Sequence, residues 1–247
     1  MSRGYLFVEE MESILSLGKE YFQHFIKVLR KKKDDIIFIC DGKGKKAPAT
    51  IVSIDYKRKQ FLLRVHKEQV SFSPPSFPFV VLFCALPKLN RLRFFLEKTV
   101  ELGVDEIHPL ITQRSIHIPQ RTENFISKAK LIIREASSQS QRVYIPQIYA
   151  PIKFGEAIKD SRTSIRILFN CLQGEDFRFV IERLKNCIPQ KISVFIGPEG
   201  DFSPEEIEEA RRGGVILSVM KNMNVLRVET CASFVVGLIN FHLKRCV

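Results

Sequence analysis

Two segments near the end of the chain carry residue types that can approach a ligand closely and stabilise charge. The first is Gly197-Pro-Glu-Gly-Asp-Phe-Ser203, which directly follows the apolar run Ile192–Ile196. Gly197 and Gly200 have no side chains, so the backbone amides and carbonyls of this segment can come close to a bound molecule. The alternative interpretation is an ordinary tight turn between a strand and a helix.

The second segment is Met220–Cys231, which follows the apolar run Val215–Val219 and leads into an apolar helix. It places Arg227, Glu229 and Thr230 between a strand and a helix. A guanidinium can stabilise negative charge, and a carboxylate can orient it or accept a proton. Alternatively, the glutamate only occupies a first helical turn, where the helix dipole favours an acidic side chain.

The elements around these segments decide whether they can meet. Ser203 is suited to be a helix N-cap, with Pro204 at the first helical position and Glu206 as the capping-box partner. Each segment would then leave the carboxyl end of a strand, which is the edge of a parallel sheet where ligands bind. The chain has neither G-x-G-x-x-G nor G-x-x-x-x-G-K-[ST], so phosphate binding of those two kinds is not expected.

After residue 78, apolar runs alternate with helical patterns, which is typical of a mainly parallel sheet covered by helices. The expected strands are Phe79–Ala85, Glu106–Leu110, Ile165–Phe169, Ile192–Ile196 and Val215–Val219. The expected helices are Arg91–Leu102, Glu123–Gln139, Phe177–Leu184, the helix after Ser203, and a last helix with Val235, Leu238, Ile239 and His242 on one face.

The N-terminal part has a different pattern, with several short strands and one helix, which predicts a small β-barrel. The expected strands are Tyr5–Val8, Asp35–Cys40, Pro48–Ile54 and Gln60–Val65, and the expected helix is Glu20–Leu29. The segment 71–78 is rich in proline and serine, as linkers often are. We therefore predict a barrel domain over residues 1–72, a linker over 73–78 and a second domain over 79–247.

The charge of the chain favours a polyanionic partner. The formal net charge is +12, and half of this excess lies in residues 1–78. Nucleic acid is the first candidate and an anionic membrane surface the second. A basic surface that serves only solubility is the alternative.

Other sequence features favour a cytosolic protein without a metal. No apolar run is long enough for a transmembrane helix, and the N-terminus does not resemble a secretory signal. Six cysteines are scattered without a C-x-x-C pair, and the five histidines show no metal-ligand spacing. We therefore expect no metal, no membrane insertion and a reducing cytoplasm.

The two C-terminal segments together resemble those of the SPOUT methyltransferases. More closely, they resemble the RsmE family, the 16S rRNA uridine-N3 methyltransferases, whose members carry G-P-E-G-G-[FL]-[ST] and L-G-x-R-[IV]-L-R-x-E-T-A. The counterparts here are Gly197–Ser203 and Lys221–Ala232. Weaker matches extend the resemblance over nearly the whole chain, namely His24–Arg30, Asp41-Gly42, Leu86–Arg91, Glu97–Gly103, Gln113–Ser115 and Glu135–Ser140.

This resemblance implies a fold and a reaction that composition and periodicity do not reveal. The expected fold is a SPOUT-type, trefoil-knotted, mainly parallel sheet with helices on both faces, preceded by a PUA-like β-barrel. The expected activity is S-adenosylmethionine-dependent methylation of a specific uridine at N3 in 16S rRNA, on the assembled small ribosomal subunit. The expected oligomer is a homodimer, and the expected location is the cytoplasm.

The site residues follow from the two matched segments. Arg227 would stabilise negative charge on the uracil, Glu229 would orient Arg227 or take the proton, and Glu199 is a second base candidate or only satisfies loop amides. The residues expected to bind the cofactor are Leu172, Ile196, Gly197, Pro198, Glu199, Gly200, Met220, Asn222, Asn224, Val225, Leu226 and Thr230. The residues expected to bind RNA, each of which can also be a solvated surface residue, are His24, Arg30, Lys31, Lys88, Arg91, Arg114 and Arg142.

The chain departs from the family pattern at four positions. Asn222 and Asp201 stand where glycine is usual, Asn224 replaces an arginine, and Val228 stands where threonine is common. Asn222 tolerates a positive φ better than most residues, so the turn can persist. Two alternatives stay open, a ribose 2′-O methyltransferase on the same fold and a non-catalytic RNA-binding assembly factor.

Overall fold

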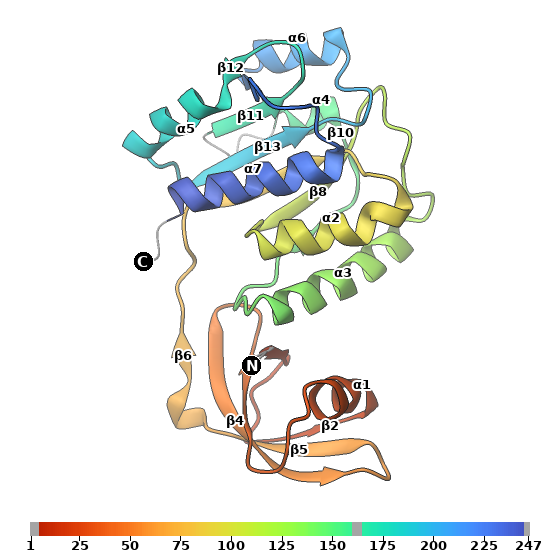
Figure 1. Cartoon of the computed structure of the whole chain (residues 1–247), viewed down its shortest axis with the longest axis vertical. Coiled ribbons are helices and arrows are strands. Elements are labelled where there is room, and N and C mark those ends of the chain that lie inside the picture. The colour runs from red at the N-terminus through yellow and green to blue at the C-terminus, as the bar shows by residue number, and fades with distance from the viewer. Residues whose placement is uncertain (1–4, 160–164, 245–247) are drawn as a thin grey trace. The chain divides into compact units, whose positions relative to one another are not determined.

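The computed structural model describes residues 5–159 and 165–244 of the chain, which form two compact units (Figure 1). The N-terminal unit contains the described residues up to Pro75 together with Ser137–Ile145. The C-terminal unit contains Ser76–Ala136 and the described residues from Pro146 onward. The segment 137–145 thus belongs to the N-terminal unit, although it lies within the range 79–247 that we assigned to the second domain.

The N-terminal unit is a curled, mainly antiparallel sheet with a short helical segment. The sheet order is β1-β3-β4-β5-β2, in which β1 and β3 run parallel, and β6 pairs with β4. Its elements are β1 (Tyr5–Phe7), β2 (Ile14–Leu17), α1 (Lys19–Tyr21), the π-helix η1 (Phe22–Val28), β3 (Ile36–Cys40), β4 (Lys45–Asp55), β5 (Gln60–Val65), the 3₁₀-helix η2 (Lys67–Gln69) and β6 (Ser71–Phe72).

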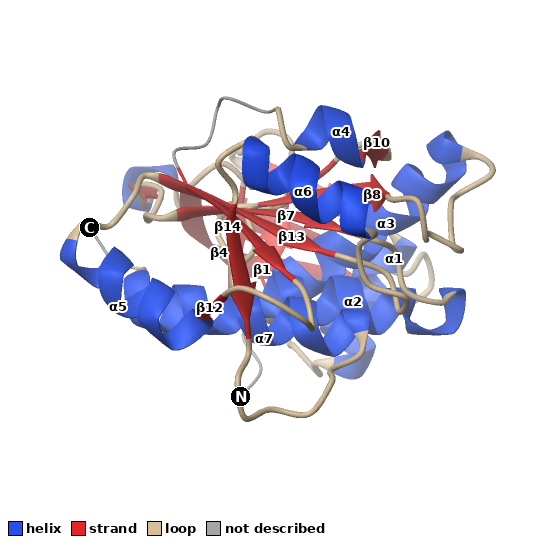
Figure 2. Cartoon of the chain, turned by 90° about the horizontal axis from the view of Figure 1, so that it is seen from above, coloured by secondary structure: helices blue, strands red, loops and turns tan. Residues whose placement is uncertain are grey.

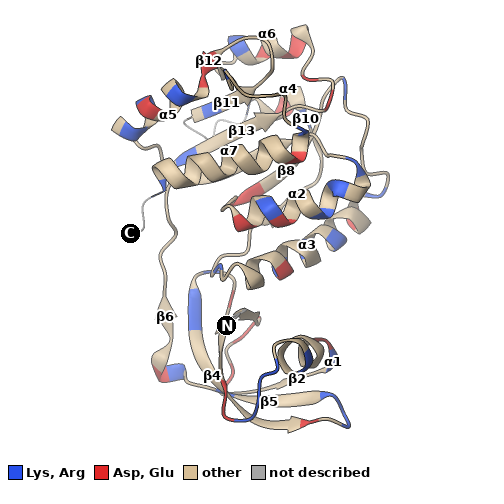
Figure 3. Ribbon diagram, viewed as in Figure 1, with Lys and Arg blue, Asp and Glu red and all other residues tan. Residues whose placement is uncertain are grey.

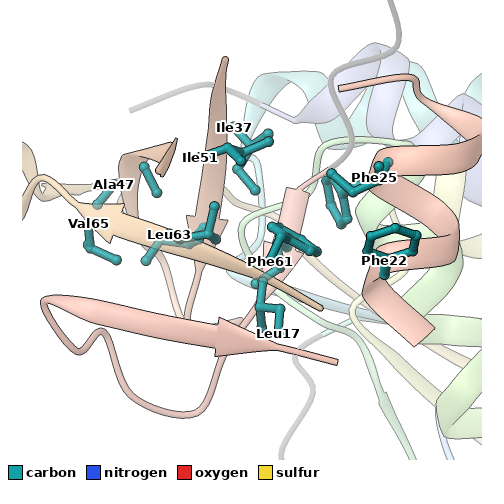
Figure 4. Packing of buried hydrophobic residues seen from close by; sticks show 13 residues of the cluster. Leu17, Phe22, Phe25, Ile37, Ala47, Ile51, Phe61, Leu63 and Val65 are labelled. Carbon is teal, nitrogen blue, oxygen red and sulfur yellow. The ribbon is translucent and has the colours of Figure 1, made fainter. Parts of the chain in front are cut away.

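Alternating burial along the strands builds the core of this unit. In β5, Phe61, Leu63 and Val65 are buried while their neighbours face outward, as the two-residue period of a strand requires. They belong to one buried cluster with Phe22 and Phe25 of η1, in which Phe61 lies nearest to these two rings (Figure 4). The segment 137–145 joins the unit through a bridge between Tyr144 and Lys43.

The expected elements of this unit needed three corrections. The strand β2 was not expected, because its four residues Ile14-Leu-Ser-Leu17 are too few to show a clear alternation of apolar and polar residues. The helix expected over Glu20–Leu29 is mostly π-helical. Ser71 and Phe72 pair with the start of β4, so a short strand, which was not expected, ends the range 1–72 that we assigned to the barrel.

The C-terminal unit is an eight-stranded sheet in which every described pairing is parallel. The order is β10-β8-β7-β13-β11-β14-β12, and β9 pairs with β8. The strands are β7 (Phe79–Cys84), β8 (Glu106–Ile111), β9 (Gln147–Ile148), β10 (Ile152–Lys153), β11 (Ile165–Phe169), β12 (Glu175–Asp176), β13 (Lys191–Ile196) and β14 (Ile216–Val219). The helices are α2 (Leu89–Glu101), α3 (Thr122–Gln139, whose last residues belong to the N-terminal unit), α4 (Phe154–Ala157), α5 (Phe177–Asn186), α6 (Pro204–Arg212) and α7 (Val228–Leu243).

Helices cover both faces of this sheet, as expected (Figure 2). On one face, α7 packs on β7 and β13 and is flanked by α2 and α5. On the other face, Phe154 of α4 and Ile207 of α6 pack on Phe83 and Phe195. Because both faces are covered, β7 and β13 are continuous apolar runs rather than alternating ones.

In the last helix, the predicted apolar face is only partly correct. Val235 and Ile239 are fully buried and Leu238 is half-buried, but His242 is exposed. The helical pattern therefore identified the element but placed its last polar residue on the wrong side.

Candidate active site

The carboxyl edge of the C-terminal sheet holds a cavity of ≈ 450 Å³. Because β13, β11 and β14 are adjacent and parallel, the loops that follow them meet at this edge. The lining comes from these loops, from the strand ends and from the first turn of α7. Gly197 of the first predicted segment and Arg227 of the second line the same cavity.

The loop between β13 and α6 is held from both of its ends. The Ser203 hydroxyl accepts a hydrogen bond from the amide of Glu206, and the Glu206 carboxylate accepts one from the amide of Ser203, which completes the expected capping box. The other carboxylate oxygen of Glu206 accepts a hydrogen bond from the amide of Gln113 at 2.9 Å. Arg114 donates to the carbonyl of Gly200 at 2.7 Å. The segment after β8 thus supports this loop.

Asp201 ties the same loop to the loop after β11. Its Oδ2 accepts a hydrogen bond from the amide of Cys171 and its Oδ1 accepts one from the amide of Phe202, each at 2.8 Å. Its backbone is left-handed, with φ of 59°. The aspartate therefore adopts a conformation that favours glycine, and its side chain adds a link between two loops of the cavity.

The loop after β11 is shaped by one buried amide side chain. The Oδ1 atom of Asn170 accepts hydrogen bonds from the amides of Leu172 and Gln173, while its Nδ2 donates to the carbonyl of Gln173. This closed pattern fixes the backbone of the loop. The side chain of Leu172 stays 85% exposed, so this loop can offer its backbone to a ligand.

The loop between β14 and α7 contributes the third wall. Asn222 adopts φ of 62°, so the asparagine occupies the left-handed conformation that the sequence suggested it could tolerate. Arg227 is the N-cap residue of α7, and its side chain is exposed. The next residue, Val228, is buried and anchors the start of the helix. Arg227 thus lines the cavity from the N-terminal end of a helix, with an exposed side chain.

Glu229 contacts a different arginine from the one that we expected. Its side chain is only 5% exposed and forms an ion pair and hydrogen bond with Arg91, which lies near the start of α2. Neither residue belongs to the cavity lining. The predicted roles of Glu229, as the orienting partner of Arg227 or as a base, stay predictions, and Arg91 has a partner within the protein.

Most of the other predicted cofactor residues line the cavity. Those in the lining are Leu172, Ile196, Gly197, Pro198, Glu199, Met220, Asn224, Val225 and Leu226, together with Arg227. Gly200, Asn222 and Thr230 lie outside it. The sequence reading missed the lining residues Phe169, Asn170, Cys171, Asp201, Val219, Lys221, Met223, Val228 and Cys231. The position of a strand end could have indicated Phe169, Asn170 and Val219, since ligand loops begin there.

The charges of the lining are separated by loop. Glu199 and Asp201 come from the loop after β13, whereas Lys221 and Arg227 come from the loop after β14. Such a cavity is suited to a ligand that carries both positive and negative groups. Burial raises the pKa of the Cys231 thiol to about 12, and burial together with Asp201 raises the pKa of Cys171. Both cysteines are therefore protonated near neutral pH, so they form part of the cavity lining and are not nucleophiles.

The residues expected to bind RNA are divided between the two units. His24 lies in η1, Arg30 and Lys31 follow it, and Arg142 lies in the segment 137–145. Lys88 is the N-cap of α2 in the C-terminal unit, which also contains Arg91 and Arg114. Lys88 and Arg30 are exposed. None of these positions by itself identifies a nucleic-acid contact.

Within residues 5–159 and 165–244, no group of three or more His, Cys, Asp or Glu side chains is arranged to hold a metal ion. No helix in that part of the chain is both long and apolar enough to cross a membrane.

The sequence of the chain matches two family models that cover most of its length. Residues 75–240 match the RNA methyltransferase domain, and residues 17–64 match the RNA methyltransferase PUA domain. The chain belongs to the RNA methyltransferase family. This membership confirms the resemblance inferred from the two C-terminal segments and the fold class of a PUA-like unit followed by a parallel α/β unit.

Relatives and solved structures agree with this assignment. The ribosomal RNA small subunit methyltransferase E of Synechocystis is 27% identical over 93% of this chain and 74% of its own length. That of Mesomycoplasma hyopneumoniae is 31% identical over 63% of this chain and 66% of its own length. A Legionella pneumophila protein described as a methyltransferase, solved with bound SAM, superposes with a TM-score of 0.83 at 25% identity and covers 99% of this chain and 98% of its own.

Proposed function

We propose that this RNA methyltransferase transfers a methyl group from S-adenosylmethionine to N3 of a uridine in 16S rRNA, within the assembled small ribosomal subunit. The observation that carries the proposal is the single cavity built by the loops after β11, β13 and β14. The relatives named for the small subunit and the SAM complex of the Legionella protein support the choice of substrate and donor.

The cavity suits this donor in size and charge. Its volume of ≈ 450 Å³ lies in the range of small-molecule sites. S-adenosylmethionine carries a cationic sulfonium, an ammonium and a carboxylate, which the separated charges of Glu199 and Asp201 on one loop and Lys221 on another can match. The backbone groups of Leu172, Gly197 and Met220 are candidates to hold the adenosine.

In the proposed reaction, the donor supplies an electrophilic methyl group, whose bond to sulfur breaks as the bond to N3 forms and the N3 proton leaves. Arg227 stabilises the negative charge that the uracil develops. Glu199, exposed and in the lining, is the candidate to take the proton. Glu229, buried against Arg91, holds the start of α7 and with it the position of Arg227.

The remaining expectations complete the proposal. The target base must leave any pairing, because N3 lies on its Watson–Crick edge. We infer that the PUA-like unit docks on RNA with His24, Arg30, Lys31 and Arg142, while Lys88 contributes from the C-terminal unit. A trefoil knot around the three loops, a homodimer and a cytoplasmic location follow from the family resemblance and belong to the same proposal.

Replacing Asp201 by glycine is expected to weaken donor binding about tenfold, because it removes the hydrogen bond to Cys171 that links two loops of the cavity and the one to Phe202 within its own loop, while keeping a residue that tolerates the left-handed backbone. Calorimetric titration with S-adenosylmethionine measures the change. Asn222→Gly is the matched control, since it places glycine at the left-handed residue of the loop between β14 and α7. It should raise the free energy of unfolding by up to about 1 kcal/mol. Equal donor affinity in the two variants would contradict the link assigned to Asp201.

Replacing Arg114 by alanine tests whether this residue supports the loop or contacts RNA. The lost bond to the Gly200 carbonyl should cost about 1 kcal/mol and reduce donor affinity severalfold. If Arg114 instead contacts an RNA phosphate, donor affinity is unchanged. The slope of log RNA affinity against log salt concentration then falls by about 1. Arg121→Ala, an exposed arginine of the same unit, is the control for loss of charge.

Two measurements test the function itself. Calorimetry with S-adenosylmethionine separates an enzyme from a non-catalytic RNA-binding assembly factor, because only the enzyme must bind the donor. Mass spectrometry of nucleosides from the 16S rRNA of a deletion strain then identifies the product. Loss of 3-methyluridine is expected, whereas loss of a 2′-O-methylated nucleoside would replace the proposal with ribose methylation.

A further inference from the structure

An exposed basic surface of the N-terminal unit includes residues that were not among those expected to bind RNA, and along the chain it adjoins Arg30 and Lys31, which were. We define the hairpin surface as Lys27 of η1 and the connection Tyr56-Lys57-Arg58-Lys59 between β4 and β5. All five residues are exposed, and four of them are basic. Figure 3 shows Lys and Arg on this connection and on the helical segment beside α1.

The connection is a rigid turn rather than a loose loop. The carboxylate of Asp55 accepts hydrogen bonds from the amides of Lys57 and Arg58, each at 2.9 Å. Lys59 adopts φ of 55°, which completes the reversal of the chain before β5. The acidic side chain is thereby engaged with the turn, and it also forms an ion pair with Arg58 at 3.9 Å. The side chain of Arg58 is 80% exposed, so this pair is weak.

Tyr56 is held in place while most of its surface stays exposed. Its ring meets the buried ring of Phe22 edge-on, with centroids 5.7 Å apart. The Lys27 ammonium lies 5.8 Å from the centre of the same ring. Even so, Tyr56 is 61% exposed. A fixed aromatic ring with an open surface is a platform on which a planar group can stack.

Further positive charge adjoins this platform. The segment 27–33 contains five basic residues. The first of them, Lys27, places its ammonium over the ring of Tyr56. Asp34 and Asp35 follow, and the Asp35 carboxylate accepts a hydrogen bond from the amide of Lys32. The net charge of the segment 27–35 and the connection 56–59 is therefore strongly positive, which suits a ligand with repeated negative charges.

We propose that the hairpin surface binds a single-stranded RNA segment, with an unpaired base on Tyr56 and successive phosphates on Lys57, Arg58 and Lys59. Stacking platforms set among cations are how proteins hold single strands, since every base has a π-face and every linkage has a charge. The inference rests on the proposed function only in that the substrate is RNA. It assigns the contact to a part of the chain that is separate from the donor cavity.

The charge contribution is tested with a variant that changes Lys57, Arg58 and Lys59 to glutamine. Binding of the full-length protein to a short polyuridylate should weaken, and the slope of log affinity against log salt should fall by about 2, since each single-strand phosphate contact contributes about 0.7. The matched control changes Lys43, Lys45 and Lys67 of the same unit, which are also exposed. Equal slopes for the two triple variants would overturn the proposal.

The stacking contribution is tested at Tyr56. Tyr56→Leu keeps an apolar contact with Phe22 but removes the ring, and it should weaken polyuridylate binding about tenfold. Tyr56→Phe keeps the ring and should bind like the unmodified protein. If the leucine variant also binds normally, the platform is excluded. If all variants bind a duplex of equal length more tightly than polyuridylate, a backbone-only contact replaces the single-strand contact.

Donor binding separates this proposal from the proposed function. S-adenosylmethionine titrations should give the same affinity for every hairpin variant, because the changes lie outside the cavity. Weak RNA binding with intact donor binding supports the hairpin surface. Intact RNA binding in the triple and leucine variants rejects it and leaves the methyltransferase proposal untouched.

Discussion

Replacing Arg227 by alanine is expected to reduce methyl transfer by about 10²–10³-fold. Arg227 is the N-cap of α7, lines the cavity and has an exposed side chain. Its guanidinium is the group best placed to meet negative charge on a base that approaches the donor. Since the backbone of the three loops is unchanged, donor affinity should stay close to that of the unmodified protein. Single-turnover rates and calorimetry measure the two quantities separately.

The control for Arg227 is Arg212→Ala, which removes an equal charge from the exposed last turn of α6. This variant should turn over normally. A fully active Arg227→Ala protein would end the catalytic assignment of this arginine. A loss of donor affinity equal to the loss of rate would instead assign Arg227 to donor binding.

Replacing Arg91 by methionine is expected to destabilise the protein by about 3 kcal/mol, because it leaves the carboxylate of Glu229 buried without its partner. Arg91 is 37% exposed, so water can partly replace it, and the lower end of the usual range applies. Urea unfolding measures the change. Arg93→Met is the matched control on the same helix, since its partners Glu97 and Glu135 are solvent-accessible and the loss should be below about 1 kcal/mol.

The double variant Arg91→Met with Glu229→Gln shows whether the effect belongs to the pair. Removing both charges should recover most of the stability that the first change costs, because no uncompensated charge is left in the interior. Additive losses in the two single variants and the double variant would mean that the residues act independently. In that case, Glu229 would be free for a role in the reaction.

The sequence predicted those helices and strands that are marked by residues close to one another in the chain. The apolar runs of β7 and β13 are strands buried on both faces, and Ser203, Pro204 and Glu206 start α6 as their spacing indicated. These features depend on neighbours within one or two turns of the chain. The left-handed backbone of Asn222 agrees with the tolerance expected of asparagine at a position where the family usually has glycine.

The contacts that the sequence did not predict join distant residues. Arg91 and Glu229 are 138 positions apart, and Asp201 reaches an amide 30 positions before it. No periodicity reports such pairs, because they depend on the order in which strands are laid into the sheet. The π-helical geometry of η1 was missed for another reason, since apolar spacing does not distinguish a π-turn from an α-turn over so few residues.

The position of β11 between β13 and β14 also affects how the protein acquires activity during synthesis. The strand is made before both of its neighbours, yet its loop forms the cavity only with segments that leave the ribosome later. Partial chains therefore lack a complete pocket, because the third wall forms only when residues 219–231 have been made. We expect a nascent polypeptide to be inert until almost its entire length has been translated, which keeps an unfinished enzyme from modifying RNA.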